Sequence, residues 1–141
     1  MKKLLLAILV LLSVKIVSVA QNTTKVNDKE SLTKKNETKF VIKQNPEDEN
    51  GNPSSNIALS FGNKTTKVDK VTGNAELIDK SEYLNKGIPK KALSACGAWW
   101  AGAGDYFYVT KVENRLVIYK GWQDETQTDK SYHWKKFKVI K

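Results

Sequence analysis

Aromatic residues are concentrated near the C-terminal end of this 141-residue chain. All four tryptophans and ten of the thirteen aromatic residues lie between Trp99 and Phe137. Aromatic and β-branched residues are enriched in strands, and large rings supply much of the apolar area that a small domain buries. The sequence therefore predicts a β-rich domain whose core lies in its C-terminal part.

A hairpin and a third strand are predicted within this region. Residues 106–112 and 115–122 flank a two-residue turn, and this register pairs Val109 with Ile118 and Tyr108 with Tyr119. Residues 132–140 form the next strand, so the three strands make a meander. One face of the hairpin is an ordinary core face and carries Phe107, Val109, Leu116, Ile118 and Trp122. The other face is amphipathic and carries Tyr106, Tyr108, Thr110, Val117 and Tyr119.

The preceding residues add one or two strands and short helices. A short strand is expected at 40–42, and another at 57–61, where apolar residues alternate with small ones. Within 79–96 one helical turn ends at Gly87, and a second helix starts at Pro89 with Cys96 on its core-facing stripe.

The predicted fold class is therefore α+β and β-dominated. It consists of a small antiparallel sheet with one or two short helices around 79–96. The sheet contains the C-terminal three-stranded meander, 106–140, plus one or two earlier strands.

The N-terminus has the pattern of a secretory signal. Lys2 and Lys3 precede the apolar stretch 4–14, and small side chains at Ser18 and Ala20 mark a cleavage site. Lys15 ends the apolar stretch well short of the roughly twenty residues that span a membrane. We expect a cleaved bacterial Sec-type signal peptide at 1–20, a periplasmic or secreted protein, and no transmembrane segment after cleavage. An uncleaved anchor is the alternative.

Composition divides the remaining chain into two parts. Residues 21–39 are almost entirely polar, so they bury too little apolar area to offset the entropy of ordering. This segment is predicted to be a flexible polar spacer. Residues 40–141 are predicted to form a single small β-rich domain with a firm core at 57–141, and the fold begins somewhere between 40 and 57.

The charge of the chain argues against a nucleic-acid partner. The formal net charge is +9, and removal of residues 1–20 takes away three lysines and leaves +6. Arg115 is the only arginine among 24 basic residues. Bidentate recognition of phosphates and bases favours arginine, whereas scattered lysine is usually a solvated surface. Attraction to anionic envelope polymers or lipid headgroups fits this composition better.

No catalytic, metal or cofactor site is predicted. The single cysteine, Cys96, cannot form an intramolecular disulfide, and the single histidine, His133, gives no spacing typical of a zinc site or a thiol protease. Two carboxylates such as Asp105 and Glu125 could serve glycoside hydrolysis, but the required separation is spatial and has no sequence signal.

The predicted binding surface is the tyrosine face, defined by Tyr106, Tyr108 and Tyr119, with Lys111 and Arg115 near its edge. Antiparallel sheets often keep one solvated face, and tyrosine rings with polar tips suit sugars and peptides. The expected function is an exported, non-catalytic binding or interaction module that uses aromatic residues on a β-sheet. Its expected partner is an envelope carbohydrate, a peptide or a partner protein.

Three alternatives stay open at this point. The tyrosines could complete a second core layer, the protein could be an envelope hydrolase with an unrecognised site, or it could be a structural exported protein without a ligand. Exposed neighbours among Trp99, Trp100, Trp122 and Trp134 would indicate binding, and buried ones would indicate a core.

Overall fold

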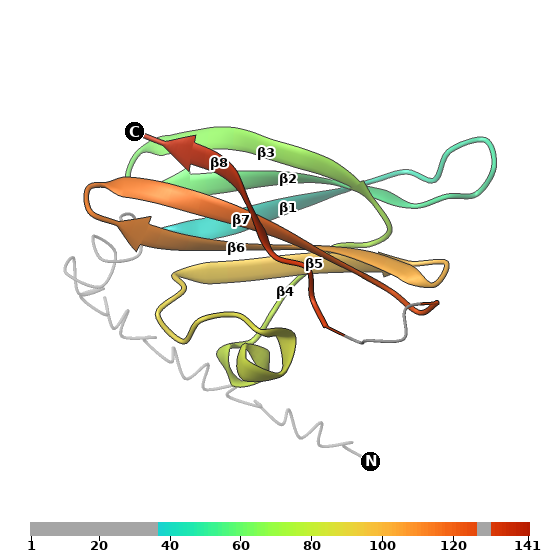
Figure 1. Cartoon of the computed structure of the whole chain (residues 1–141). Helices are drawn as coiled ribbons and strands as arrows, with labels where there is room; N and C mark the ends of the chain where they lie inside the picture. Colours follow the sequence, from blue (N-terminus) through green and yellow to red (C-terminus); the bar gives the residue numbers. More distant parts are fainter. Residues whose placement is uncertain (1–36, 127–130) are drawn as a thin grey trace, which may run out of the picture.

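The computed structural model describes residues 37–126 and 131–141, which form two antiparallel sheets (Figure 1). The first sheet has the order β1-β2-β3 and consists of β1 (Lys39–Asn45), β2 (Ser54–Phe61) and β3 (Lys64–Thr72). The second sheet has the order β4-β5-β6-β7-β8 and consists of β4 (Glu76–Leu77), β5 (Ser94–Trp100), β6 (Ala103–Val112), β7 (Arg115–Asp124) and β8 (Lys135–Ile140). The prediction of a β-dominated antiparallel fold is confirmed.

Helical structure in the described residues is limited to two 3-10 turns. These are η1 (Lys80–Glu82) and η2 (Leu84–Lys86), and the second ends at Gly87 as predicted. No helix in the described ranges is long and apolar enough to cross a membrane. The predicted signal peptide and residues 21–36 of the predicted spacer lie outside the described residues.

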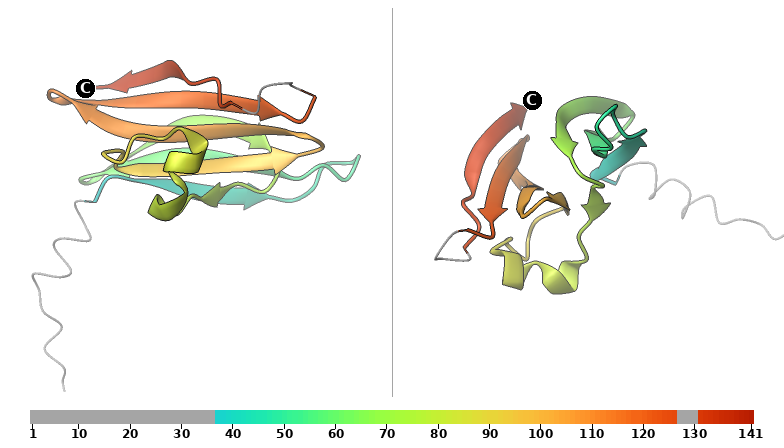
Figure 2. Two further views of the ribbon diagram at one scale, coloured as in Figure 1. Left: turned by 60° about the horizontal axis from the view of Figure 1, so that its bottom comes forward. Right: turned by 90° about the vertical axis from the view of Figure 1, so that its right-hand side faces the viewer.

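The two sheets pack face to face around one core. Figure 2 (right) looks nearly along the strands, with β1 to β3 on one side and β6 to β8 on the other. Alternation along β2 and β6 directs every second side chain into the space between the sheets. The buried residues of this core are Phe40, Ile57, Leu59, Val68, Val71, Ala75, Cys96, Ala98, Phe107, Val109 and Ile118.

The predicted hairpin and meander are confirmed in their register. Strand β6 pairs with β7 so that Val109 lies opposite Ile118 and Tyr108 opposite Tyr119. Strand β7 then pairs with β8. The period-two pattern and the two-residue turn were sufficient to predict this register, because both strands are long and their connection is short.

The predicted helix at 89–96 is wrong, because its last residues belong to strand β5. This strand pairs with β6 along its whole length, and β4 pairs with its middle. Cys96 does face the core as predicted, and its side chain is fully buried, but it does so from a strand. Hydrogen bonding to neighbouring strands outweighs the local helical preference of residues such as Ala95.

Strand β3 is not predicted because a bulge disrupts its pattern. The register of β2 and β3 shifts between Ile57 and Ala58, which leaves Val68 without a direct partner. Val68 and Val71 are three residues apart, yet both are buried in the core. A regular strand would place them on opposite faces, so the sequence shows no period of two.

The outer face of the second sheet carries a smaller second core. The chain between β4 and β5 folds back over this face, as seen below the sheet in Figure 1. Tyr108 stacks on Tyr119 with ring centroids 4.8 Å apart and meets Trp134 edge-on at 4.7 Å. The buried members of this cluster are Tyr83, Ile88, Ala92, Ala95 and Tyr108.

Trp122 lies on the expected face of the sheet but outside the core. Its ring is 42% exposed, and it shares a surface groove with Thr72, the last residue of β3. The first sheet therefore ends before it can cover this ring. Phe107 on the same face is fully buried beneath the first sheet.

Phe107→Ala should destabilise the protein more than Trp122→Ala. Loss of the fully buried Phe107 ring should lower the free energy of unfolding by about 3 to 5 kcal/mol, through lost burial and a residual cavity. Loss of the half-exposed Trp122 ring should lower it by roughly 1 to 2 kcal/mol. Urea titrations of both variants measure the difference, and equal losses would contradict this placement of the core.

Candidate functional site

Two tryptophans from different strands line one groove at an end of the sandwich. Trp100 closes β5 and Trp122 lies near the end of β7, and their side chains are 41% and 42% exposed. The groove has a volume of about 260 Å³. We call it the tryptophan groove, and it is lined by Thr72, Trp100, Ala103, Gly104, Asp105, Trp122 and Gln123.

The hairpin geometry of the second sheet places these side chains. Trp100 lies opposite Ala103 across a tight turn in which Gly102 has φ +83, and Trp122 lies opposite Asp105. Strand β6 separates the two tryptophan-bearing strands, so β5 and β7 are roughly 10 Å apart at about 4.8 Å per strand. The groove floor between the indoles is thus formed by the small residues of β6 and by the Asp105 carboxylate.

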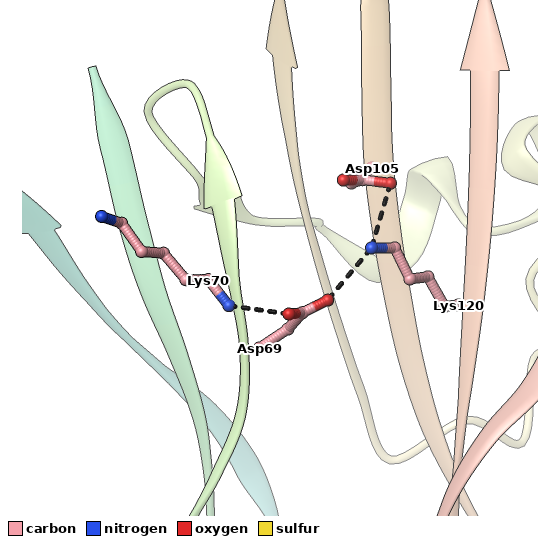
Figure 3. Close-up of polar contacts among 4 residues, drawn as sticks. All are labelled: Asp69, Lys70, Asp105 and Lys120. Carbon is pink, nitrogen blue, oxygen red and sulfur yellow. Dashed lines mark hydrogen bonds and ion pairs between the residues drawn. The ribbon is translucent and has the colours of Figure 1, made fainter. Parts of the chain in front are cut away.

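An ion-pair network fixes the carboxylate in this floor. Lys120 Nζ lies 3.0 Å from Asp69 Oδ2 and 3.3 Å from Asp105 Oδ1 (Figure 3). The second oxygen of Asp69 accepts a hydrogen bond from the Lys70 backbone N–H at 2.9 Å. The network therefore joins β3 of the first sheet to β6 and β7 of the second, and it holds Asp105 beside Trp122.

The pKa of Lys120 reflects this network. Burial of the ammonium group would by itself lower the pKa, but the hydrogen bond with Asp69 and the charges of Asp105 and Asp69 raise it above its usual value. The ammonium therefore stays protonated and neutralises part of the negative charge in the groove floor.

Trp122 also contacts a residue that precedes β8. The rings of Trp122 and His133 stack with centroids 4.9 Å apart and planes at 28°. This contact covers one side of the indole and limits its rotation. The exposed side of the ring is thereby presented in a defined orientation.

A second groove lies on the opposite face of the second sheet. It has a volume of about 330 Å³, and its walls include Trp99, Tyr106 and Lys86. Lys86 Nζ lies 3.6 Å from Glu82 and within 5.6 Å of the Tyr106 ring centre. The cation and the ring in this groove thus already interact with each other. Trp99, 44% exposed, points to this side, whereas its neighbour Trp100 points into the tryptophan groove.

The structure brings the predicted tyrosines together but covers two of them. Tyr106 and Tyr108 are only 8% and 7% exposed, and Tyr119 is half-buried. Burial raises the pKa of Tyr106 to about 12 and also raises that of Tyr108. Tyr108 belongs to the second core, because the segment between β4 and β5 and Trp134 cover it. Tyr106 lies outside that cluster and packs edge-on against Tyr132, with ring centroids 4.9 Å apart.

The two predicted basic residues lie away from the buried rings. Lys111 and Arg115 are exposed beside the β6–β7 turn, at the end of the hairpin opposite Trp122. The structure therefore does not bring them to the tryptophan groove. Trp100, Asp105 and Trp122 were not predicted as a site, although the concentration of tryptophans near strand ends was visible in the sequence.

The described groups that could carry metal or thiol chemistry are dispersed or buried. Within 37–126 and 131–141, no group of three or more histidine, cysteine, aspartate or glutamate side chains is placed to hold a metal ion. Cys96 is buried in the core, and burial raises the pKa of its thiol, which disfavours the thiolate form. Asp69 and Asp105 are both engaged by Lys120.

Comparison of the chain with protein-family models, with curated proteins and with solved structures finds no match. The geometry of the grooves is therefore the basis for a functional proposal. Of the two grooves, only the tryptophan groove is lined by two half-exposed indoles.

Lys120→Met should weaken the contact between the sheets. The loss of hydrogen bonds to two carboxylates should lower the free energy of unfolding by about 2 kcal/mol at pH 7. Because folding raises the pKa of Lys120, its contribution is fully present below pH 10.5 and is lost as pH rises through the folded-state pKa. Urea titrations at pH 7, 9 and 11 should therefore show the difference from wild type shrinking at the highest pH. Lys43→Met, which removes an exposed lysine, is the control, and an equal loss in both variants would contradict a role for the network.

Proposed function

We propose that this protein is a small non-catalytic binding module that holds a neutral carbohydrate in the tryptophan groove. One observation carries the proposal: Trp100 and Trp122, from separate strands, are each about two-fifths exposed and line the same groove. Large half-exposed rings that converge on a concave site are typical of ligand contact rather than of a core.

The chemistry of the groove favours a sugar ring. The apolar C–H face of a sugar can pack on an indole, while its hydroxyl groups need hydrogen-bond partners at the edge. Thr72, Asp105 and Gln123 line the groove and supply a hydroxyl, a carboxylate and an amide. The hydroxyl and the amide can donate and accept, and the carboxylate can accept, so together they can satisfy sugar hydroxyl groups.

The volume of the groove and the charge of its floor limit which carbohydrates can bind there. A volume of about 260 Å³ lies just below the roughly 300 to 1,000 Å³ of pockets that enclose drug-sized ligands. One or two sugar rings fit this size. Asp105 lies in the floor, and Lys120 offsets only part of its charge because the same ammonium also pairs with Asp69, so an anionic sugar is disfavoured at this position.

Trp100→Ala and Trp122→Ala should each weaken binding of a neutral oligosaccharide at least tenfold. The reason is that each substitution removes one of the two ring surfaces. An array of immobilised neutral oligosaccharides identifies the best ligand, and isothermal titration calorimetry with that ligand measures the loss. Thermal melts establish that each variant is folded.

Trp99→Ala is the matched control. Trp99 is adjacent in sequence and equally exposed, but its side chain lies on the opposite face of the sheet. Its replacement should leave affinity within about twofold. Equal losses for Trp99→Ala and Trp100→Ala, or an array without any bound neutral sugar, would overturn the proposal. Capture of a peptide by the same groove would replace the carbohydrate with a different ligand class.

We also propose that the protein is exported by a Sec-type signal and acts in the periplasm or outside the cell. The support is the charged, apolar and small-residue pattern of residues 1–20. Expression of the full-length chain should yield a product that begins at Gln21, because Ser18 and Ala20 have the small side chains that signal peptidase requires. N-terminal sequencing of fractionated bacterial cells measures this, and recovery of an intact Met1 terminus in the cytoplasm would refute export.

A further inference from the structure

Positive charge in the described residues is concentrated on two edge strands. Strand β3 and residues 135–141 together hold seven lysines and one acid, whereas the other described residues hold nine basic and eleven acidic side chains. We call this set the basic seam. It comprises Lys64, Lys67 and Lys70 on β3, Lys135, Lys136 and Lys138 on β8, and Lys141 after it.

The two strands of the basic seam lie next to each other in space. Strand β3 is the edge of the first sheet and β8 is the edge of the second. Lys138 Nζ donates a hydrogen bond to the Lys67 backbone oxygen at 2.7 Å, which joins the two edges. Both strands lie along the same side of the sandwich in Figure 1, although they are about 70 residues apart in the sequence.

Most lysines of the basic seam lack an internal counter-charge. The one acid in the set, Asp69, pairs with Lys120 rather than with a lysine of the seam. Among the described residues, no acidic side chain forms an ion pair with five exposed lysines, namely Lys64, Lys67, Lys135, Lys136 and Lys141. This side of the molecule therefore presents positive charge that a partner can neutralise.

We propose that the basic seam binds a linear anionic polysaccharide. Strand β3 has nine residues and extends over roughly 30 Å, so its lysines and those of β8 are spread along the edge rather than gathered in a compact cluster. A linear polymer with one negative charge every few ångströms can contact the whole basic seam at once. This binding goes beyond the neutral ligand of the tryptophan groove and does not depend on it.

The side chains beside the lysines favour a polysaccharide over a membrane. The solvent-facing residues of β3 besides lysine are mainly threonines, which offer hydroxyl groups and no apolar anchor. Phe137 on β8 is 40% exposed, but its ring packs on Phe107 with centroids 5.8 Å apart and so is directed into the sandwich. Peripheral membrane attachment ordinarily adds inserted apolar side chains to basic charge.

The same composition disfavours nucleic acid. The basic seam contains no arginine, which is the residue that pairs with phosphates and base edges through two parallel hydrogen bonds. Single-stranded nucleic acids also require exposed rings for base stacking, and the only ring on β3 or β8 is that of Phe137. Lysine side chains alone respond to the charge density of a polyanion. Binding of a polysaccharide by the basic seam therefore does not depend on its exact sugar sequence.

The test compares two variants of equal net charge. The seam variant carries Lys64→Gln, Lys67→Gln, Lys136→Gln and Lys141→Gln. The control variant carries Lys43→Gln, Lys80→Gln, Lys90→Gln and Lys91→Gln, all at exposed positions outside the basic seam. The probe is heparin, a sulfated polysaccharide, and the readout is the dissociation constant between 50 and 200 mM NaCl.

Wild type and the control variant should bind heparin with similar affinity, and the seam variant should bind at least tenfold more weakly. Four lost contacts should also reduce the slope of log K against log salt by about 3, at roughly 0.7 per contact for a flexible polyanion. Equal weakening of both variants would mean that net charge alone drives binding, and this would overturn the proposal. Tighter binding to anionic phospholipid vesicles or to single-stranded DNA of equal charge would also overturn it.

This experiment is independent of the carbohydrate proposal. Trp100→Ala should bind heparin as wild type does, and the seam variant should retain its affinity for a neutral oligosaccharide. Thermal melts of both four-fold variants confirm folding. If Lys138 and Lys120 are left unchanged, the contacts between the sheets are preserved.

Discussion

Burial of strand β6 on both faces is the constraint on which the rest of the structure depends. Phe107 enters the core between the two sheets, and its neighbour Tyr108 enters the second core under the chain segment between β4 and β5. On the same face, the Tyr106 ring packs directly over Gly97, where a Cβ atom would collide with it. Both faces of the central strand are thus covered along its middle, which leaves the ends and edges of the sandwich more accessible.

The two proposed binding surfaces occupy these remaining positions. The tryptophan groove lies at one end of the sandwich, where β3 has ended and the core face of the second sheet is uncovered. The basic seam lies along the side, where the edge strands of the two sheets meet. Lys120 links these surfaces structurally, because it bonds to Asp69 on β3 and to Asp105 in the groove floor.

Sequence patterns predicted the elements whose geometry is regular. The alternation along β6 and β7 and their two-residue turn predicted both the hairpin register and the side chains on each face. Strand β3 was missed because a bulge at Val68 interrupts its alternation, and β5 was assigned to a helix because its small residues carry no strand signal. Both errors arise where pairing with distant strands, rather than local preference, decides the conformation.

The sequence by itself determined a β-dominated chain, a buried Cys96, and lysine as nearly its only basic residue. It predicted the core in the aromatic C-terminal part, whereas residues of the first sheet such as Phe40, Ile57 and Leu59 supply much of that core. Only the tertiary structure decided which aromatic rings are accessible. Tyr108 and Trp122 both lie on predicted strands, but the first is covered by a distant chain segment and the second extends past the end of the opposite sheet. The period of a strand specifies the face on which a side chain lies. Whether that face is covered depends on the lengths and positions of other elements, which no local pattern encodes.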